Sequence, residues 1–238
     1  MRHPLSFFLY LCFLPFFIQG QQEQFEVLTT NEGLISNHID DVLVDQFGFL
    51  WLASYDGVQK WDGLRGAQFT HQPADVNSLP DNISNCLHED QYGNIWIGTL
   101  KGLCVYLRDN QSIQRLDLKQ EDLPVNTILA LDSGSLLVGT SDGLCLVDPT
   151  TFRVSWPFPD LSHTAIFSLS QGVENTIWVG TLGHGLYVLN LQTQKATTFG
   201  AKAEHAPKKI TRLLLDHRGR LWLGSFDQGV QVLDPTSP

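Results

Sequence analysis

The sequence predicts an all-β protein assembled from one repeated unit of four short strands, and three observations carry this prediction. A compound phrase recurs five times along the chain of 238 residues. Its copies are spaced 40 to 45 residues apart, and none shows a helical hydrophobic period. Within each copy, short apolar and β-branched runs alternate with Gly and Asp turns. A unit of this length that cannot bury both faces by itself stacks its copies around an axis, so a β-propeller is expected.

The phrase itself begins with an apolar strand, passes through an Asp and a Gly, and continues into a strand centred on Trp. A Gly-Thr pair or a relative follows, and then a Gly opens a third apolar strand. The Trp position is occupied in order by Trp51, Trp96, Leu137, Trp178 and Trp222. The third unit has therefore lost its Trp, and its Asp position is assigned to Asp132. Because the rings recur mid-strand at one position, they are expected to fill the wedge between blades rather than to bind ligand.

Five blades of four hairpin-connected strands are expected from these units, at about residues 38–71, 82–116, 127–158, 165–199 and 209–234. The fifth unit lacks an outer strand, and the run Phe25–Leu28 precedes the first unit with no partner of its own. Two interpretations remain open. Either residues 25–28 close a five-bladed ring, or the chain is the opening portion of a larger propeller.

The first twenty residues read as a secretory signal peptide. Arg2 and His3 precede an apolar run from Leu5 to Ile18, which is shorter than a membrane-spanning helix, and Gly20 supplies the small residue expected before cleavage. The mature domain is then residues 21–238, exported to the periplasm, with no further segment apolar enough for membrane insertion. A formal net charge of −10 argues against a nucleic-acid partner, since phosphates require a basic face.

The units resemble the two-component regulator propeller repeat, and the resemblance covers residues 25 to 234. The second unit carries it most fully, through Asp90, Gly93, Trp96, Gly98, Thr99, Gly102 and Leu103. The stretch Asn31–Asn37 resembles the lead segment that opens such sensor regions. WD40 and Asp-box propellers fit less well in spacing.

That resemblance implies the periplasmic sensor of a hybrid histidine kinase of Bacteroidetes, in a ring that usually has seven blades and senses an oligosaccharide or another small ligand. It also implies a homodimer formed through parts beyond this chain, which would be an N-terminal fragment of the kinase. The chain holds no phosphoacceptor His in a helical context and no Gly-rich ATP site. We therefore expect no enzyme activity. The alternatives are an exported propeller lyase or hydrolase, and a stand-alone protein-interaction propeller.

Ligands of propellers generally bind at one mouth of the central channel, where the turns between second and third strands gather. Residues in these turns vary between units while the framework stays constant, which favours recognition. The candidate ligand-binding residues are Tyr55, Asp56, Lys101, Asp142, His184, Phe226 and Asp227. A lyase would need a His beside acidic groups, for which His184 with Asp142 is the single candidate pair.

No catalytic residue, metal site or cofactor is predicted. The histidines are scattered without zinc-type spacing. Cys86 and Cys104 are expected on the first and third strands of one blade, beyond disulfide reach, and Cys145 occupies the position of Cys104 in the next blade. We predict three buried, reduced thiols.

Overall fold

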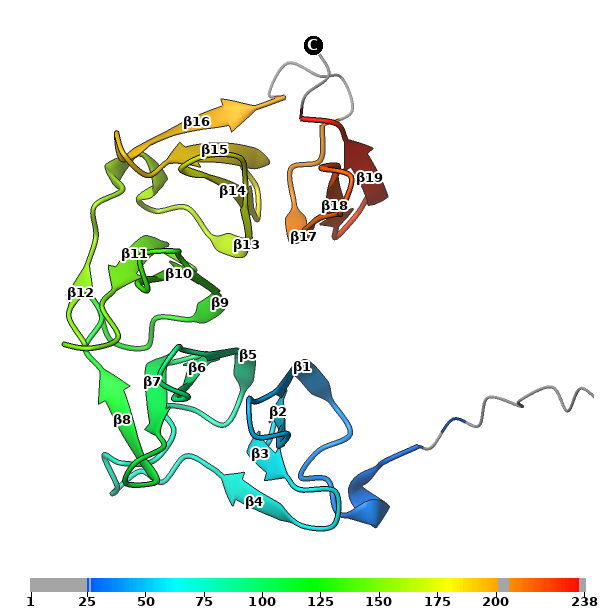
Figure 1. Cartoon of the computed structure of the whole chain (residues 1–238), viewed down its shortest axis with the longest axis vertical. Helices are drawn as coiled ribbons and strands as arrows, with labels where there is room; N and C mark the ends of the chain where they lie inside the picture. Colours follow the sequence, from blue (N-terminus) through cyan, green and yellow to red (C-terminus); the bar gives the residue numbers. More distant parts are fainter. Residues whose placement is uncertain (1–24, 26, 201–205, 236–238) are drawn as a thin grey trace, which may run out of the picture.

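The computed structural model describes residues 25, 27–200 and 206–235 as an arc of five antiparallel β-sheets (Figure 1). The predicted signal peptide, residues 1–20, lies outside the described residues. The strands β1, β5, β9, β13 and β17 face the centre of the arc, and later strands of each sheet lie progressively further out (Figure 1). The predicted all-β propeller fold is confirmed.

Each blade follows the same strand order from the centre outwards. The first blade contains β1 (Ile39–Val44), β2 (Leu50–Ser54), β3 (Gly57–Trp61) and β4 (Gly66–Phe69). The second contains β5 (Ser84–Glu89), β6 (Ile95–Thr99), β7 (Gly102–Leu107) and β8 (Ser112–Leu116). The third contains β9 (Val125–Ala130), β10 (Leu136–Thr140), β11 (Gly143–Val147) and β12 (Val154–Ser155).

The fourth blade contains β13 (Ile166–Gln171), β14 (Thr176–Thr181), β15 (Leu186–Asn190) and β16 (Lys195–Phe199). The fifth contains β17 (Ile210–Leu215), β18 (Leu221–Ser225) and β19 (Gly229–Leu233). Two short 3-10 helices, η1 (Thr30–Glu32) and η2 (Pro159–Leu161), lie in the segments that lead into the first and fourth blades. No helix among the described residues is long and apolar enough to span a membrane.

The hydrophobic core lies between the blades. Trp51 and Val58 of the first blade pack with Ile95 and Ile97 of the second. Three further clusters repeat this arrangement at the next three blade junctions. Each of the first four blades therefore buries one face against its successor, as expected of a repeat that is unstable alone.

The conserved order of the phrase follows from two side-chain contacts. In the first, second and fifth blades the Asp carboxylate accepts a hydrogen bond from the indole of the same blade, at 3.0 Å for Trp51, 2.8 Å for Trp96 and 2.9 Å for Trp222. In the first four blades a Ser or Thr hydroxyl at the end of the second strand donates to the carbonyl of the Gly that opens the third, as Thr99 does to Gly102 at 3.0 Å.

The third blade shows that the Asp position of the repeat was wrongly assigned to Asp132. The turn that Asp45 closes in the first blade, through hydrogen bonds with Phe49 and Gly48, is closed by Leu131 in the third. Asp132 therefore lies one residue past the Asp position. Leu131 cannot accept an indole hydrogen bond, and Leu137 replaces the indole in a fully buried site. The third blade therefore lacks both the carboxylate and the ring.

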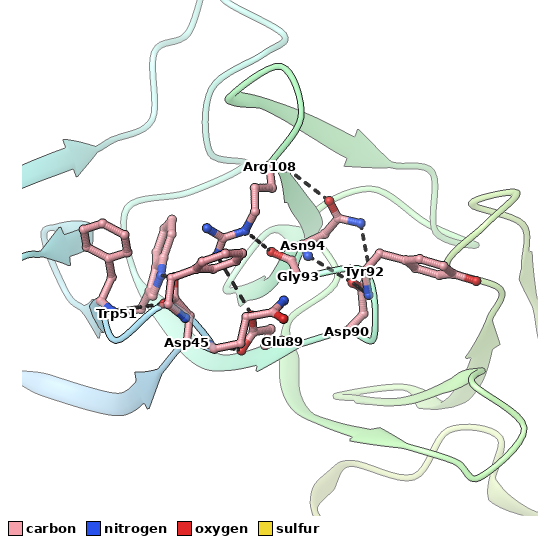
Figure 2. Close-up of polar contacts among 11 residues, drawn as sticks. Asp45, Trp51, Glu89, Asp90, Tyr92, Gly93, Asn94 and Arg108 are labelled. Atoms are coloured by element: carbon pink, nitrogen blue, oxygen red, sulfur yellow. Dashed lines mark hydrogen bonds and ion pairs between the residues drawn. The ribbon is translucent and has the colours of Figure 1, made fainter.

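Neighbouring blades are also joined by a polar contact at the end opposite the β2–β3 turns (Figure 2). Arg108, which follows β7, donates from Nη2 to Asp45 Oδ2 of the first blade at 2.8 Å and from Nε to the Gly93 carbonyl at 2.9 Å. Its guanidinium lies 4.0 Å from the centre of the Phe47 ring. One arginine thus connects the turn of its own blade to the turn of the preceding blade.

Closure of a five-bladed ring by residues 25–28 is not what the structure shows. In the part of the chain that the structure describes, β19 pairs only with β18, and Phe25, Val27 and Leu28 are exposed outside any strand. The physical reason lies in Gln59, which is almost fully buried. Its amide donates to the Gly33 carbonyl and accepts from Ile35 N, both at 2.9 Å, and so holds the leading segment against the first blade. The sheets form an open arc (Figure 1).

The arc leaves one apolar blade face uncovered. Val230 in β19 is 65% exposed, whereas the residues at its position in the other blades, Val58, Leu103, Leu144 and Leu186, are buried. Leu214 on the same face is 65% exposed as well. The fifth blade therefore presents to solvent the face that its predecessors pack against the next blade.

Candidate functional site

A β-bulge recurs near the start of every inner strand. In the first blade, the pairing of β1 with β2 skips one residue between Ile39 and Asp41, and the other four inner strands skip the equivalent residue. The skipped residues are Asp40, Asn85, Asn126, Phe167 and Thr211. A bulge frees a residue from the ladder and changes the direction of its side chain, which is why bulges occur beside functional sites.

All five bulge residues line one cavity of about 490 Å³. Leu100 and Ser141, from turns between second and third strands, complete its wall together with Pro124 and Arg212. The cavity therefore lies at the mouth of the channel where those turns gather, and every blade contributes at least one residue to it.

Two bulge residues link adjacent blades. Asn85 Nδ2 donates to the Val125 carbonyl, the first residue of β9, at 2.9 Å. Asn126 Nδ2 donates to the Ile166 carbonyl, the first residue of β13, at 2.9 Å, and lies 3.4 Å from Ser141 Oγ. Each amide nitrogen is thus used in a link to the next blade, and an amide oxygen can only accept hydrogen bonds.

The cavity combines opposite charges with an aromatic surface. Asp40 belongs to the first blade and Arg212 to the fifth, so the charged side chains of the wall balance each other. Phe167 adds a ring from the fourth blade, and Thr211 and Ser141 add hydroxyl groups. This set suits a small polar molecule with an apolar face and little net charge.

The turn residues predicted as ligand-binding lie at the same mouth but do not converge. The Tyr55 ring lies against that of His38, with centroids 3.8 Å apart, and Asp56 is exposed. Lys101 pairs with Asp81 at 3.6 Å, in the segment that leads into its own blade. Adjacent residues take their place in the cavity wall, since Leu100 and Ser141 line it.

Asp142 is the most engaged of the predicted residues. It binds Lys119 Nζ through Oδ2 at 2.6 Å and His163 Nδ1 through Oδ1 at 2.9 Å. The hydrogen bond from Lys119, followed by that from His163, lowers the pKa of the Asp142 carboxyl. Its carboxylate thus joins the segments that lead into the third and fourth blades.

The remaining predicted residues lie at the fourth and fifth blades. His184 is exposed and lines a separate pocket of about 730 Å³ beside β19, with Phe199 and Leu233. Asp227 pairs with Lys209 at 3.2 Å, and the Lys209 ammonium lies 5.8 Å from the Phe226 ring centre. No hydrogen bond or ion pair joins His184 to Asp142 in the described part of the chain, so the pair proposed for a lyase is not assembled; His163 is the partner of Asp142.

The bulge residues were missed by sequence reasoning, although the sequence contains a signal for them. Each lies eleven residues before the Trp position of its unit, from Asp40 before Trp51 to Thr211 before Trp222. This column changes from acid to amide to aromatic to hydroxyl, while the preceding column is mostly apolar, with Ile39, Ser84, Val125, Ile166 and Ile210. A variable column inside a constant strand was hidden because the bulge breaks the alternation expected of a regular strand.

Residues 78–101 match the family model described as two component regulator propeller. This chain carries the two component regulator propeller repeat. The matched stretch contains β5, β6 and the bulge residue Asn85 of the second blade. A comparison with curated proteins gives no match.

Solved structures share the fold of this chain. The extracellular domain of the hybrid two component system BT3049 from B. thetaiotaomicron superimposes with a TM-score of 0.77 at 23% identity, over 89% of this chain and 30% of that one. The extracellular domain of BT4673 from B. thetaiotaomicron gives 0.70 at 22% identity, over 82% of this chain and 27% of that one. Virginiamycin B lyase from Staphylococcus aureus gives 0.61 at 11% identity, over 83% of this chain and 70% of that one. The chain spans less than a third of the length of either B. thetaiotaomicron chain.

Proposed function

We propose that this propeller is the ligand-sensing part of an exported two-component sensor and that it recognises an oligosaccharide at the mouth of its channel. The observation that carries the proposal is the cavity into which all five blades place their bulge residue. A site contributed by every blade responds to any change in the spacing of the blades, so a bound ligand changes the free energy of the whole arc. The family repeat supports the signalling context.

The chemistry of the wall supports a carbohydrate. Sugars offer many hydroxyl donors and an apolar ring face, and the cavity supplies carboxylate and amide acceptors beside the Phe167 ring. The opposite charges of Asp40 and Arg212 leave the wall without a strong preference for an anion or a cation. Since the lining groups include no assembled nucleophile and base, the proposed role is binding without chemistry.

The uncovered face of the fifth blade supports a second part of the proposal, that further blades of the same repeat complete the ring. Val230 and Leu214 occupy positions that are covered by the next blade elsewhere in the arc. A β-rich sensor of this kind would transmit through parts beyond the propeller, including a kinase and a dimer contact. Sequencing of the gene beyond the codon for Pro238 is the direct test. A reading frame that encodes no more repeats would contradict this part of the proposal.

The experiment for the ligand is a panel of neutral, amino and acidic oligosaccharides screened by saturation-transfer NMR on the full chain. Binding should be lost in Phe167→Ala, because the ring forms part of the cavity wall. Tyr92→Ala is the matched control, since Tyr92 is an exposed aromatic residue in the β5–β6 turn at the opposite end of the blade (Figure 2). Equal loss in both variants, or no binding by any member of the panel, would contradict the proposal.

A further inference from the structure

Asp40 departs from a pattern that its neighbours follow. The bulge residues of the second and third blades are Asn85 and Asn126, and each donates to the carbonyl of the first residue in the next inner strand. Asp40 is the bulge residue of the first blade and lies at the same position in the pairing of β1 with β2. The equivalent carbonyl in the second blade is that of Ser84, the first residue of β5.

An ionised carboxylate has no hydrogen to donate, so Asp40 cannot make the contact that Asn makes. Its Oδ2 is buried without a hydrogen-bond partner. The other oxygen, Oδ1, lies 3.6 Å from Nε2 of His38, whose ring lies against that of Tyr55. An acceptor is therefore held at the cavity wall in a place where the fold itself favours a donor.

We infer that Asp40 is the residue that selects the ligand, by accepting a hydrogen bond at its carboxylate from a hydroxyl or ammonium group of the molecule in the cavity. The inference rests on the proposed function, in that it takes the channel mouth as the ligand site. Asp40 therefore lacks the hydrogen bond that an Asn at this position donates to the next blade. A bound ligand supplies a hydrogen-bond donor at that place instead.

The stability of Asp40→Asn tests this inference without any ligand. The new amide should donate to the second blade as Asn85 and Asn126 do, and the melting temperature should rise by about 2–4 °C. Asn85→Asp is the matched control, because it removes the same type of link one blade further on and should lower the melting temperature by a similar amount. If Asp40→Asn melts at or below the wild-type temperature while Asn85→Asp is destabilised, the inference is overturned.

Binding completes the test. Cellotetraose and maltotetraose supply hydroxyl donors only, whereas a chitosan tetramer adds ammonium groups. The class that binds with the higher affinity identifies the donor from which Asp40 accepts a hydrogen bond. Any member that binds the wild type should bind Asp40→Asn at least about tenfold more weakly, because an amide is a poorer acceptor than a carboxylate. Equal affinity would overturn the role of Asp40 and leave the channel-mouth site standing. If no member binds the wild type, the proposed carbohydrate function fails together with this role, whatever the stability result.

Discussion

Arg108 Nη2 donates a hydrogen bond to Asp45 Oδ2 across the junction of the first two blades, over 2.8 Å (Figure 2). The Asp45 side chain is fully buried and the Arg108 side chain is 21% exposed. The same Asp45 oxygen accepts from the Trp51 indole, and its partner Oδ1 accepts from the backbone of Phe47 and Phe49. One carboxylate thus orders a turn, a core ring and a neighbouring blade.

We predict that Arg108→Ala lowers the free energy of unfolding by about 3 kcal/mol, since it leaves a buried carboxylate without its cation. Urea unfolding followed by Trp fluorescence measures the change. Arg218→Ala is the control, because Arg218 is exposed and only its backbone contacts Asp216, so its effect should stay within about 0.5 kcal/mol. Similar effects of the two variants would show that the link across the blades contributes nothing.

The stability of the chain should fall in acid partly through Asp45. Burial raises the pKa of this carboxyl, but the hydrogen bonds from Trp51 and Arg108 and from the turn backbone outweigh burial and lower it below the usual value. A carboxyl with a lowered folded-state pKa stabilises the protein above its unfolded pKa, and the contribution is lost as the pH falls through the folded value. Urea midpoints measured between about pH 6 and pH 2 should therefore decrease less steeply in Asp45→Asn than in the wild type. Parallel curves would contradict this assignment.

The concerted loss of Asp and Trp in the third blade predicts energetic coupling in the second. Asp90→Leu and Trp96→Leu should each cost about 2–4 kcal/mol, since one removes the acceptor of the buried indole and the other leaves a cavity. The double variant reproduces the Leu131 and Leu137 pair and should cost about 1 kcal/mol less than the two single costs together. A double-mutant cycle in urea measures this coupling, and simple additivity would argue against a shared origin of the two losses.

The three thiols of the folded domain should be inert. Cys86, Cys104 and Cys145 are free and buried, as the sequence predicted. Burial raises the pKa of Cys86 and of Cys145 to about 12, so almost no thiolate is present near neutral pH. In a Cys12→Ser variant, a thiol reagent at about pH 8 should label none of them before unfolding and all of them in urea. Rapid labelling of the native protein would contradict the buried assignment.

The uncovered face of the fifth blade should make the chain self-associate. Leu214→Lys and Val230→Lys each place a charge on this face and should shift the protein toward the monomer, as light scattering after gel filtration would show. Val173→Lys is the control, since Val173 is 72% exposed in the β13–β14 turn, away from that face. If all three variants associate like the wild type, the face of the fifth blade does not drive association.

The repeat and the fold it encodes were determined by the sequence. A period near 43 residues, fixed Gly turns and a recurring Trp specify four short strands and leave each blade one face that only another blade can cover. The reduced thiols followed from strand spacing, and the burial of Trp51, Trp96 and Trp178 followed from their equivalent positions. These features depend on contacts within a blade or between successive blades, which a repeated pattern records directly.

The site and the closure of the ring were decided by the tertiary structure. One β-bulge in each blade places its residue at the wall of the same cavity, and the five residues meet only because five separate units curve around a common axis. These residues are Asp40, Asn85, Asn126, Phe167 and Thr211. The leading segment lies against the first blade, where the buried Gln59 amide satisfies the backbone groups of Gly33 and Ile35. Contacts of this kind join residues of different units. Because all units share one sequence pattern, the pattern alone does not say which of their residues meet.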